Sequence, residues 1–417
     1  MEYIQSAVGF FTLLFLGAIF SENFKAIKLS YLVNAIVLQI ILVILLIKVP
    51  WITNFFELLA GGVEALKSAT DKGTAFVFGY LAPGSPGAPF DISNPDSIPI
   101  FAFGVLPLVI VISALSAVLW HWRIIPVIVQ GISILFKKPL NVGGPVGLSA
   151  TANIFLGQVE APLLVRPYLA SMTKHELLIL MTVGMSTIAG SLMVALTAML
   201  SPLYGNGLIG HFLIASIISV PAGIMYANMI IPSDIKTDFP QSSETQLYKG
   251  TMDALTEGTR SGLEIFLNIV AILIVVIALV ELVNIILGYF PHVYGSALTL
   301  EKIAGWIFSP LAWCMGISWQ ESQLAGELLG VKTILNEVFA YINLSQLDSN
   351  EFSEKSRIIM LYALCGFGNF SSVGILLGGL GAIIPDRKEE LISIGGRALY
   401  ASLLASCMTG FMVGIIY

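Results

Sequence analysis

Long apolar runs separated by short polar segments make up most of the chain. Residues 4–20 and 31–49 are apolar, and each is long enough to cross a bilayer core of about 30 Å. The polar segment 21–30 between them carries Lys25 and Lys28. Because the second run follows so closely, we expect the first to be a membrane helix and not a signal peptide that is removed. Further spans are predicted at 100–120, 211–231, 263–290 and 398–416.

Two other segments alternate apolar and charged residues at helical spacing. They are 51–70 and 121–140, and the pattern is typical of amphipathic helices that lie in the membrane interface. Polar stretches or stretches rich in proline and glycine mark the connections. We expect a loop at 83–99, a solvated loop at 233–260, a polar link at 345–356 and a charged turn at 385–397.

One segment, residues 149–167, is apolar at both ends and polar in its middle. Gln158 and Glu160 stand there beside the helix breakers Gly157 and Pro162. A carboxylate at membrane depth is costly unless it is paired or faces a wet cavity, so polar residues in such a place indicate function. The segment therefore predicts a re-entrant hairpin with a functional tip. The alternative is an ordinary loop between two core helices.

The second half of the chain repeats this arrangement. A second hairpin is predicted within 303–346, and its LNEVFA (335–340) resembles LGQVEA (156–161). A helix follows each tip, and each helix is interrupted by Gly, Ser or Asn, at 187–190 in the first copy and within 357–384 in the second. A Thr-x-x-Glu capping box opens the first of these helices. Two such copies of opposite orientation form an inverted repeat, whose binding site is expected at the membrane midplane.

Composition supports a polytopic membrane protein. Of 417 residues, 56% are hydrophobic and only 11% are charged, and the mean hydropathy is +0.89, whereas about a quarter of the residues of a soluble domain are charged. The net charge of -6 forms no basic patch, so we expect no nucleic-acid partner. Cys314, Cys365 and Cys407 are far apart in apolar surroundings and predict buried packing residues, with neither a metal site nor a disulfide framework.

The distribution of positive charge sets the expected orientation. If the turn with Lys25 and Lys28 is cytoplasmic and both hairpins are re-entrant, most of the Lys and Arg residues lie inside. Both termini would then face outward.

Two other functional classes fit the sequence less well. An intramembrane aspartyl protease needs membrane aspartates, but the Asp residues lie in polar segments, and no hydrolase or phosphate-loop motif occurs in a usable context. A channel should carry polar residues along one helix, whereas here they gather at the hairpin tips. We therefore expect a transporter and not an enzyme.

Three motifs resemble the concentrative nucleoside transporters, in particular the bacterial, sodium-coupled type. They are GQVEAPLLVRP (157–167), GVKTILNEVFAY (330–341) and CGFGNFSS (365–372). Two departures stand out. The family usually has Thr where this chain has Val159, which removes a hydroxyl, and it has Phe-Val where this chain has Val338-Phe339, which alters packing.

The resemblance implies an all-α polytopic membrane protein with about eight transmembrane helices, two re-entrant hairpins of opposite orientation, broken helices and interfacial helices. It also implies a homotrimer in the cell inner membrane, in contact with lipid, with a scaffold part and a mobile transport part. The expected division is 1–50 (transport part), 51–140 (scaffold part), 141–232 (transport part, first repeat), 233–262 (cytoplasmic loop), 263–302 (scaffold part, trimer contact) and 303–417 (transport part, second repeat).

The resemblance also implies a nucleoside site between the two tips. Gln158 and Glu160 would meet the base, directly or through water, and Leu192 would cover the apolar side of the base. The full set of implied substrate residues is Gly157, Gln158, Val159, Glu160, Leu192, Glu337, Phe367, Asn369 and Ser372.

The second tip and the second broken helix would hold the sugar. Glu337, Asn369 and Ser372 would bind the ribose hydroxyls, and Phe367 would close the pocket beside the sugar. A carboxylate that accepts two hydrogen bonds discriminates well against a sugar that lacks one hydroxyl. Each polar residue could instead cap a helix or satisfy a kinked backbone.

The coupling ion implied by the resemblance is sodium, and no cofactor is expected. Its implied ligands are Asn153, Val183, Ser186, Thr187 and Ile188, since a hard cation takes oxygen ligands. The expected function is import of nucleosides such as uridine with sodium, by an elevator-like movement of the transport part. The alternative is coupling to protons, carried by Glu160 or Glu337.

Overall fold

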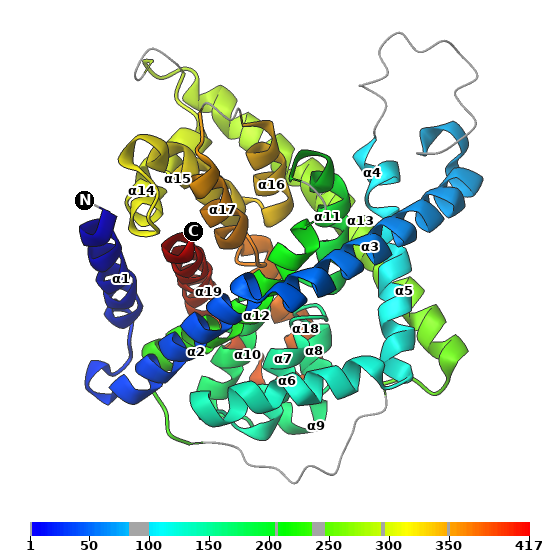
Figure 1. Ribbon diagram of the computed structural model, residues 1–417, viewed down its shortest axis with the longest axis horizontal. Coiled ribbons are helices and arrows are strands. Elements are labelled where there is room, and N and C mark those ends of the chain that lie inside the picture. The colour runs from blue at the N-terminus through cyan, green and yellow to red at the C-terminus, as the bar shows by residue number, and fades with distance from the viewer. Residues whose placement is uncertain (1, 83–99, 205–206, 236–246, 293–296, 348–350) are drawn as a thin grey trace.

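The protein is described by a computed structural model that covers residues 2–82, 100–204, 207–235, 247–292, 297–347 and 351–417 (Figure 1). Within these ranges all regular elements are helical. Six helices are long and apolar enough to cross a membrane, and two shorter apolar helices, Tyr3–Ile19 and Phe370–Ile383, bring the number to the expected eight if they also cross. The all-α polytopic fold is confirmed. The loop predicted at 83–99 lies outside the described residues.

The first third of the chain follows the apolar pattern closely. Both predicted N-terminal spans are helices, and the segment 51–70 forms part of a longer one. Proline at the first position of the third helix and of the fifth suits a helix start, because the missing N–H would have no partner there. The helices are α1 (Glu2–Ile19), α2 (Leu29–Lys48), α3 (Pro50–Phe78), α4 (Phe101–Gly104), α5 (Pro107–His121) and α6 (Ile124–Leu140).

The next third contains the first hairpin and its broken helix. Thr173 accepts a hydrogen bond from the Glu176 backbone N–H while the Glu176 carboxylate binds the Thr173 backbone N–H, so the predicted capping box is confirmed. The helix that it opens is interrupted at 187–189, as predicted. The elements are α7 (Gly144–Ala152), α8 (Glu160–Leu163), α9 (Arg166–Leu169), α10 (Lys174–Ser186), α11 (Gly190–Tyr204) and α12 (Leu208–Ile230).

The last third repeats this order after one long helix. Asn336, Ser353 and Asn369 each cap a helix with a side-chain oxygen. The elements are α13 (Thr251–Leu287), α14 (Leu300–Cys314), α15 (Trp319–Ile334), α16 (Glu337–Gln346), α17 (Glu354–Ala363), α18 (Phe370–Ile383), η4 (Pro385–Arg387) and α19 (Lys388–Ile416).

Three predicted boundaries are wrong. The loop predicted at 233–260, which the expected division extends to 262, ends earlier because α13 already begins at Thr251. Within this segment, residues 236–246 lie outside the described residues. The charged turn 385–397 is short, because α19 begins at Lys388. The segment 303–346 is not one hairpin: α14 is a separate helix that packs along α15, and the second hairpin is α15 and α16 alone.

The early start of α13 has a packing reason. Its small residues Ala254, Gly258 and Gly262 are buried against α5, whereas the polar residues between 251 and 260 are exposed. A Cβ on Gly258 would lie 2.8 Å from the Ser113 backbone oxygen, so only glycine allows this approach. These polar residues lie on the outer face of the helix. In the sequence alone, so many polar residues close together predicted a loop.

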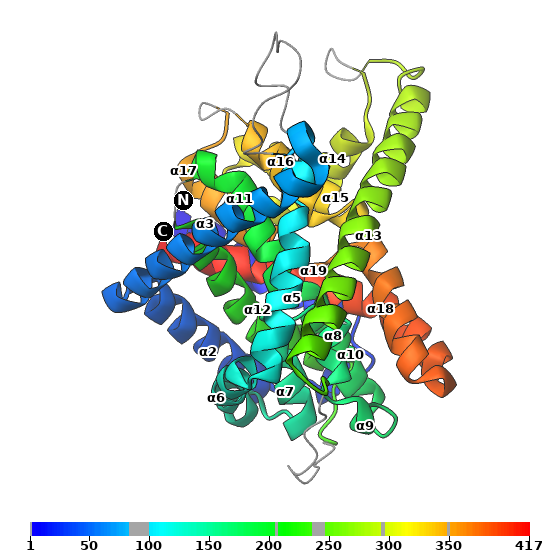
Figure 2. The ribbon, with the colours of Figure 1, turned by 90° about the vertical axis from the view of Figure 1, so that its right-hand side faces the viewer.

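The two hairpins lie at opposite ends of the molecule. In Figures 1 and 2 the first hairpin, α7 to α9, lies at the lower end and the second, α15 and α16, at the upper end. Helices α10, α12 and α19 fill the space between, and the spans that contain them are more than four-fifths buried. The site residues therefore come from two units that approach the centre from opposite sides.

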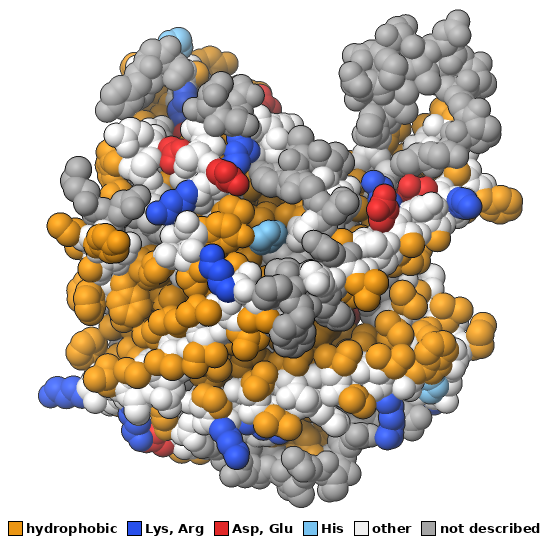
Figure 3. All heavy atoms as spheres, in the orientation of Figure 1, with side chains coloured by type: hydrophobic (Ala, Val, Ile, Leu, Met, Phe, Trp, Pro, Cys, Tyr) orange, Lys and Arg blue, Asp and Glu red, His pale blue; other side chains and the backbone are white. Residues whose placement is uncertain are grey.

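Helices α5 and α13 form a pair at the periphery (Figure 2). The apolar window of α13 is only 6% buried within the chain. Figure 3 shows apolar side chains in a band across the visible face, with charged side chains gathered mainly above and below it. This distribution suits a protein surrounded by hydrocarbon at mid-height.

Polar contacts join the elements at the lower end. Glu22, in the turn between α1 and α2, binds Lys174 at 2.9 Å and also binds Arg397. These hydrogen bonds hold the pKa of the Glu22 carboxyl below its ordinary value. Lys28 pairs with Asp234 at 2.7 Å. Positive residues of both repeats thus meet at this end, where the charge distribution predicts the cytoplasm.

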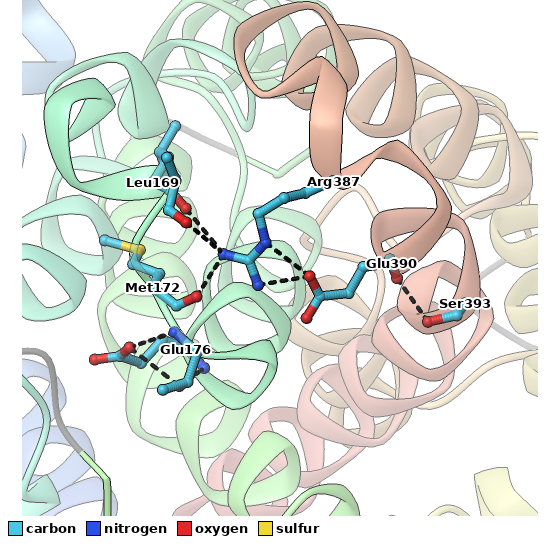
Figure 4. A network of polar contacts seen from close by, with 8 residues as sticks. Leu169, Met172, Glu176, Arg387, Glu390 and Ser393 are labelled. Atoms are coloured by element: carbon cyan, nitrogen blue, oxygen red, sulfur yellow. Dashed lines mark hydrogen bonds and ion pairs between the residues drawn. The ribbon is translucent and has the colours of Figure 1, made fainter.

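Arg387 connects the first hairpin to the last helix (Figure 4). Its guanidinium donates to the backbone oxygens of Leu169 at 3.1 Å, Ala170 at 3.3 Å and Met172, all of which follow or end α9. It also pairs with Glu390, on α19, at 2.6 Å. The lower ends of the two repeats are therefore fastened together.

Candidate functional site

The first hairpin tip, residues 153–159, rests on the helices that follow it. The Gly190 backbone N–H donates to the Phe155 backbone oxygen at 3.0 Å, and a Cβ on Gly190 would lie 2.8 Å from that oxygen. A Cβ on Gly184 would lie 3.2 Å from the Gln158 Cβ. Glycines on α10 and α11 thus let the tip approach the break between these two helices.

The second tip ends in a buried acid. Asn336 caps α16 by accepting a hydrogen bond from the Phe339 backbone N–H at 2.9 Å, which places Glu337 in the first turn. The Glu337 side chain is 3% exposed, and its carboxylate accepts a hydrogen bond from the Asn369 side chain at 2.9 Å. Asn369 caps α18, the half of the second broken helix that follows the break. The second tip therefore binds the start of α18.

The two helix breaks cross each other. The Phe367 backbone N–H donates to the Thr187 backbone oxygen at 3.2 Å. Gly366 has a φ of 124°, and a Cβ there would lie 2.8 Å from the Ser186 backbone oxygen. Backbone groups that both breaks leave without helical partners therefore come together near the centre of the molecule, between the two tips.

A series of hydrogen bonds links the first tip to the second. The Gln158 amide donates to the Ser372 backbone oxygen at 3.5 Å, the limit of a hydrogen bond. The Ser372 N–H donates to the Asn369 side-chain oxygen at 2.8 Å, and the Asn369 amide reaches Glu337. Gln158 Oε1 is buried and has no hydrogen-bond partner. A buried acceptor without a hydrogen bond lowers the stability of the folded protein unless a ligand supplies a donor.

The hydrogen bonds of Glu160 lie outside this series. Its carboxylate accepts hydrogen bonds from the Gly157 backbone N–H at 2.9 Å and from the Ser261 hydroxyl, on α13, at 3.2 Å. The first contact shapes the tip, and the second joins the tip to the peripheral pair α5 and α13. The structure therefore brings Gln158 and Glu337 into one hydrogen-bonded series and places Glu160 beside it.

The apolar candidates line the same region less closely. Leu192, on α11, is 5% exposed, and Phe367 is partly exposed in the second break. Val159 packs against α18, where a Cβ on Gly379 would lie 2.5 Å from its Cγ1. A valine at this position therefore makes a packing contact.

Of the residues implied for sodium, Val183, Ser186, Thr187 and Ile188 lie at the first break, and Asn153 follows α7 in the first hairpin. The Ser186 and Thr187 hydroxyls both donate to the Val183 backbone oxygen, at 3.2 and 3.0 Å, so their lone pairs remain available as acceptors. Asn153 is 1% exposed, and its Oδ1 has no hydrogen-bond partner. Three side-chain oxygens thus fit a small cation. The Ile188 N–H is engaged by Ser216 at 3.4 Å.

Sequence reasoning missed two residues of this region. Ser261 fell in the segment predicted as loop, although it contacts Glu160. Lys332 is completely buried, and its ammonium donates to the Ala363 backbone oxygen at 2.8 Å. The signal was present in the motif at 330–341, where a charged residue stands among apolar ones.

Comparisons with known proteins agree with this geometry. Residues 8–81 match the family model for the Na+ dependent nucleoside transporter N-terminus, residues 102–203 the model named Nucleoside recognition, and residues 211–414 the model for the Na+ dependent nucleoside transporter C-terminus. The nucleoside permease NupC of Helicobacter pylori is 32% identical over 98% of this chain and 97% of its own length.

The chain belongs to the concentrative nucleoside transporter family. Another relative in the comparisons is the uncharacterized transporter YutK of Bacillus subtilis, 34% identical over the full length of both chains. The sodium/nucleoside cotransporter 1 of Rattus norvegicus is 31% identical over all of this chain and 64% of its own length. Membership in this family of Na+-dependent transporters makes the chain a multi-pass membrane transporter and not an enzyme.

Solved structures of the protein named CNTnw have the same fold. CNTnw in an inward-facing substrate-bound state is 30% identical with a TM-score of 0.88, over 100% of this chain and 98% of that one. A CNTnw variant in an outward-facing state is 29% identical with a TM-score of 0.87, over the same shares of both chains. The likeness is common to both states, so the concentrative nucleoside transporter fold is identified independently of conformation.

Proposed function

We propose that the protein is a symporter that imports nucleosides such as uridine together with sodium. The observation that carries the proposal is the hydrogen-bonded series from Gln158 through Ser372 and Asn369 to Glu337, with an orphaned acceptor at Gln158 Oε1. A nucleoside offers donors at both of its ends, on the base edge and on the ribose. The series offers acceptors at both of its ends.

The polar groups suggest how the substrate lies. Gln158 binds the edge of the base, and Leu192 and Val159 contribute apolar surface. Glu337, with Asn369 holding its carboxylate, accepts hydrogen bonds from the ribose hydroxyls. Glu160 acts on the base side from its position beside Gly157. Ser372 and Phe367 complete the sugar end of the site.

Sodium binds at the first break. Asn153 Oδ1 is a buried oxygen without a donor, and the Ser186 and Thr187 hydroxyls present lone pairs. The end of α10 also contributes partial negative charge from its last carbonyls. Because the first tip rests on this break, sodium binding orders the tip that holds the base. That coupling makes nucleoside affinity depend on sodium.

Transport requires the tips to change sides. Helices α5 and α13 form a static scaffold, assembled as a homotrimer in the inner membrane, and the two repeats move against it in an elevator-like manner. The peripheral position of the pair, with α13 mostly exposed, supports this division. The Glu160–Ser261 hydrogen bond crosses the proposed boundary and must break during the movement.

The test is uptake of labelled uridine into proteoliposomes. With a sodium gradient at constant pH, we expect accumulation against the nucleoside gradient, and saturation that other nucleosides compete with. Uptake driven by a pH gradient and indifferent to sodium would replace sodium by protons. Uptake of no nucleoside by a correctly folded protein would refute the proposal.

Asn153→Ala provides the sharper version of this test. It should raise the sodium concentration for half-maximal uptake by about tenfold, since a lost ion ligand is worth 1–2 kcal/mol. The matched control is Asn228→Ala, because Asn228 is a buried asparagine that donates to a backbone oxygen four residues back, as Asn153 does. Equal sodium dependence in the two variants would place the ion elsewhere.

A further inference from the structure

The two repeats can be aligned on their shared landmarks. Leu156, Val159 and Ala161 of the first tip match Leu335, Val338 and Ala340 of the second, and this register pairs Asn153 with Lys332. In the broken helices the caps Thr173 and Ser353 and the restarts Gly190 and Phe370 are equally spaced in sequence. This second register pairs Val183 with Ala363.

The backbone oxygens of Val183 and Ala363 are equivalent in the two repeats, but they accept hydrogen bonds from different kinds of donor. In the first repeat the Val183 oxygen accepts from the hydroxyls of Ser186 and Thr187. Their counterparts in the second repeat are Gly366 and Phe367, which carry no hydroxyl. The Ala363 oxygen is instead bound by the Lys332 ammonium at 2.8 Å.

The contrast extends to charge. The first repeat offers a buried side-chain oxygen without a donor, at Asn153. At the matching position the second repeat offers a completely buried ammonium, at Lys332. A lysine buried at membrane depth is costly and marks function unless it meets negative charge. The ammonium lies at the C-terminal end of α17, where helix carbonyls supply that charge.

We propose that Lys332 is a tethered cation that fills the second repeat's counterpart of the sodium site. The three oxygen-bearing side chains of the first site, Asn153, Ser186 and Thr187, are replaced by Lys332, Gly366 and Phe367, so the second position has no side-chain ligand for an ion. The lysine supplies the positive charge permanently. Each break thus has one cation at its helix end, exchangeable in the first repeat and fixed in the second.

The proposed role of Lys332 rests on the proposed sodium coupling. It also predicts how many sodium ions are carried with each nucleoside. Two acids, Glu160 and Glu337, are then accompanied by two cations, of which only one moves with the substrate. One sodium ion should be carried per nucleoside, because the second position cannot load or release its charge. Lys332 acts as a positioning residue: it holds the end of α17 and stabilises the tip that carries Glu337.

The test uses the full-length protein in proteoliposomes and in detergent. Lys332→Asn installs the counterpart of Asn153, and Lys332→Met is the matched control, which removes the charge and offers no oxygen. The apparent Tm is measured as choline is replaced by sodium at constant ionic strength. Charge moved per nucleoside is measured from the ratio of current to flux.

We expect one charge per nucleoside and a response to a single sodium ion in the unmodified protein. Lys332→Met should lower Tm at every sodium concentration and keep that response. Lys332→Asn should respond to two ions, with about twice the slope of stabilisation against log sodium at saturation and up to two charges per nucleoside. Identical sodium responses in the two variants would overturn the proposal.

The unmodified protein decides the question if neither variant folds. Two charges per nucleoside would show a second exchangeable ion and would refute a fixed one, whereas one charge supports it. A protein whose uptake ignores sodium would refute the proposed coupling instead. If both variants fold, the difference between Lys332→Asn and Lys332→Met in sodium-dependent Tm decides the role of the lysine.

Discussion

At the scale of single residues, Asn369 holds the centre of the site. Its amide donates to Glu337, and its oxygen accepts from the Ser372 backbone N–H and from the Ser371 hydroxyl at 2.7 Å. One side chain therefore caps α18 and orients the acid of the second tip. Sequence reasoning gave these as alternatives, cap or ligand holder, and the geometry allows both at once.

Glu337→Gln tests the acid without changing its shape. We expect uptake to fall about 100-fold, because a carboxylate acceptor of two ribose hydrogen bonds is worth roughly 3 kcal/mol more than an amide that must also place its NH2 group. Uridine uptake and the amount of folded protein in the membrane are the measurements. Glu354→Gln, at an exposed position in the first turn of α17, is the matched control.

The loss should concern the ribose end. Uptake of 2'- and 3'-deoxy nucleosides should fall less than that of uridine, since they make fewer hydrogen bonds to the acid. Full uridine uptake by Glu337→Gln would remove this residue from the site.

What the sequence predicted at this scale follows from local motifs. Gln158, Glu337, Asn369 and Ser372 were found because tips and breaks leave a local polar signature, and the structure joins them. Contacts between distant helices leave none. Ser261 was missed because nothing in its own segment indicates that Glu160 lies across from it.

At the scale of elements, the crossing of the two breaks depends on one glycine. Gly366 combines a positive φ of 124° with a backbone oxygen of Ser186 that would lie 2.8 Å from any Cβ. Neither condition suits an L-residue. The close approach of the second break to the first therefore needs glycine at this position.

Gly366→Ala should separate the breaks. We expect a loss of about 2–4 kcal/mol of stability, from the strained φ and the steric contact together, seen as a lower Tm and lost uptake. Gly374→Ala is the matched control: its Cβ would meet nothing within 4 Å, and alanine favours the interior of α18. A Gly366→Ala protein with unchanged Tm and uptake would mean that the breaks can move apart freely.

Element type was predictable, and element ends were not. Apolar length gave the spans, and helix breakers gave the interruptions at 187–190 and within 357–384. Charged helix starts were misassigned as loops, as at Thr251 and Lys388. Acidic residues favour the first turn of a helix, and at η4 and α19 the ion pair between Arg387 and Glu390 satisfies charges that otherwise suggest solvent.

At the scale of the whole molecule, charged contacts fasten the two repeats to each other, whereas the first tip meets the peripheral pair through a neutral group. Arg387 joins the end of α9 to α19 with several hydrogen bonds (Figure 4). Glu22, in the turn between α1 and α2, binds Lys174 of the first repeat and Arg397 of the second. The first tip is bound to α13 by a neutral hydroxyl, that of Ser261, which donates to the Glu160 carboxylate. This asymmetry suits repeats that move as one body.

Strengthening this contact between Ser261 and Glu160 should stop the proposed movement. Ser261→Lys would place an ammonium beside the Glu160 carboxylate and convert the 3.2 Å hydrogen bond into a partly buried ion pair, which is costly to break once formed. We expect uridine turnover to fall at least about tenfold while equilibrium binding of uridine changes less than about threefold, since tenfold in rate needs only 1.4 kcal/mol. Ser261→Met, of similar length without charge, controls for bulk and should turn over faster than Ser261→Lys. Normal turnover in Ser261→Lys would mean that the first tip keeps its place against α13 throughout the cycle, and the elevator-like movement would have to be abandoned.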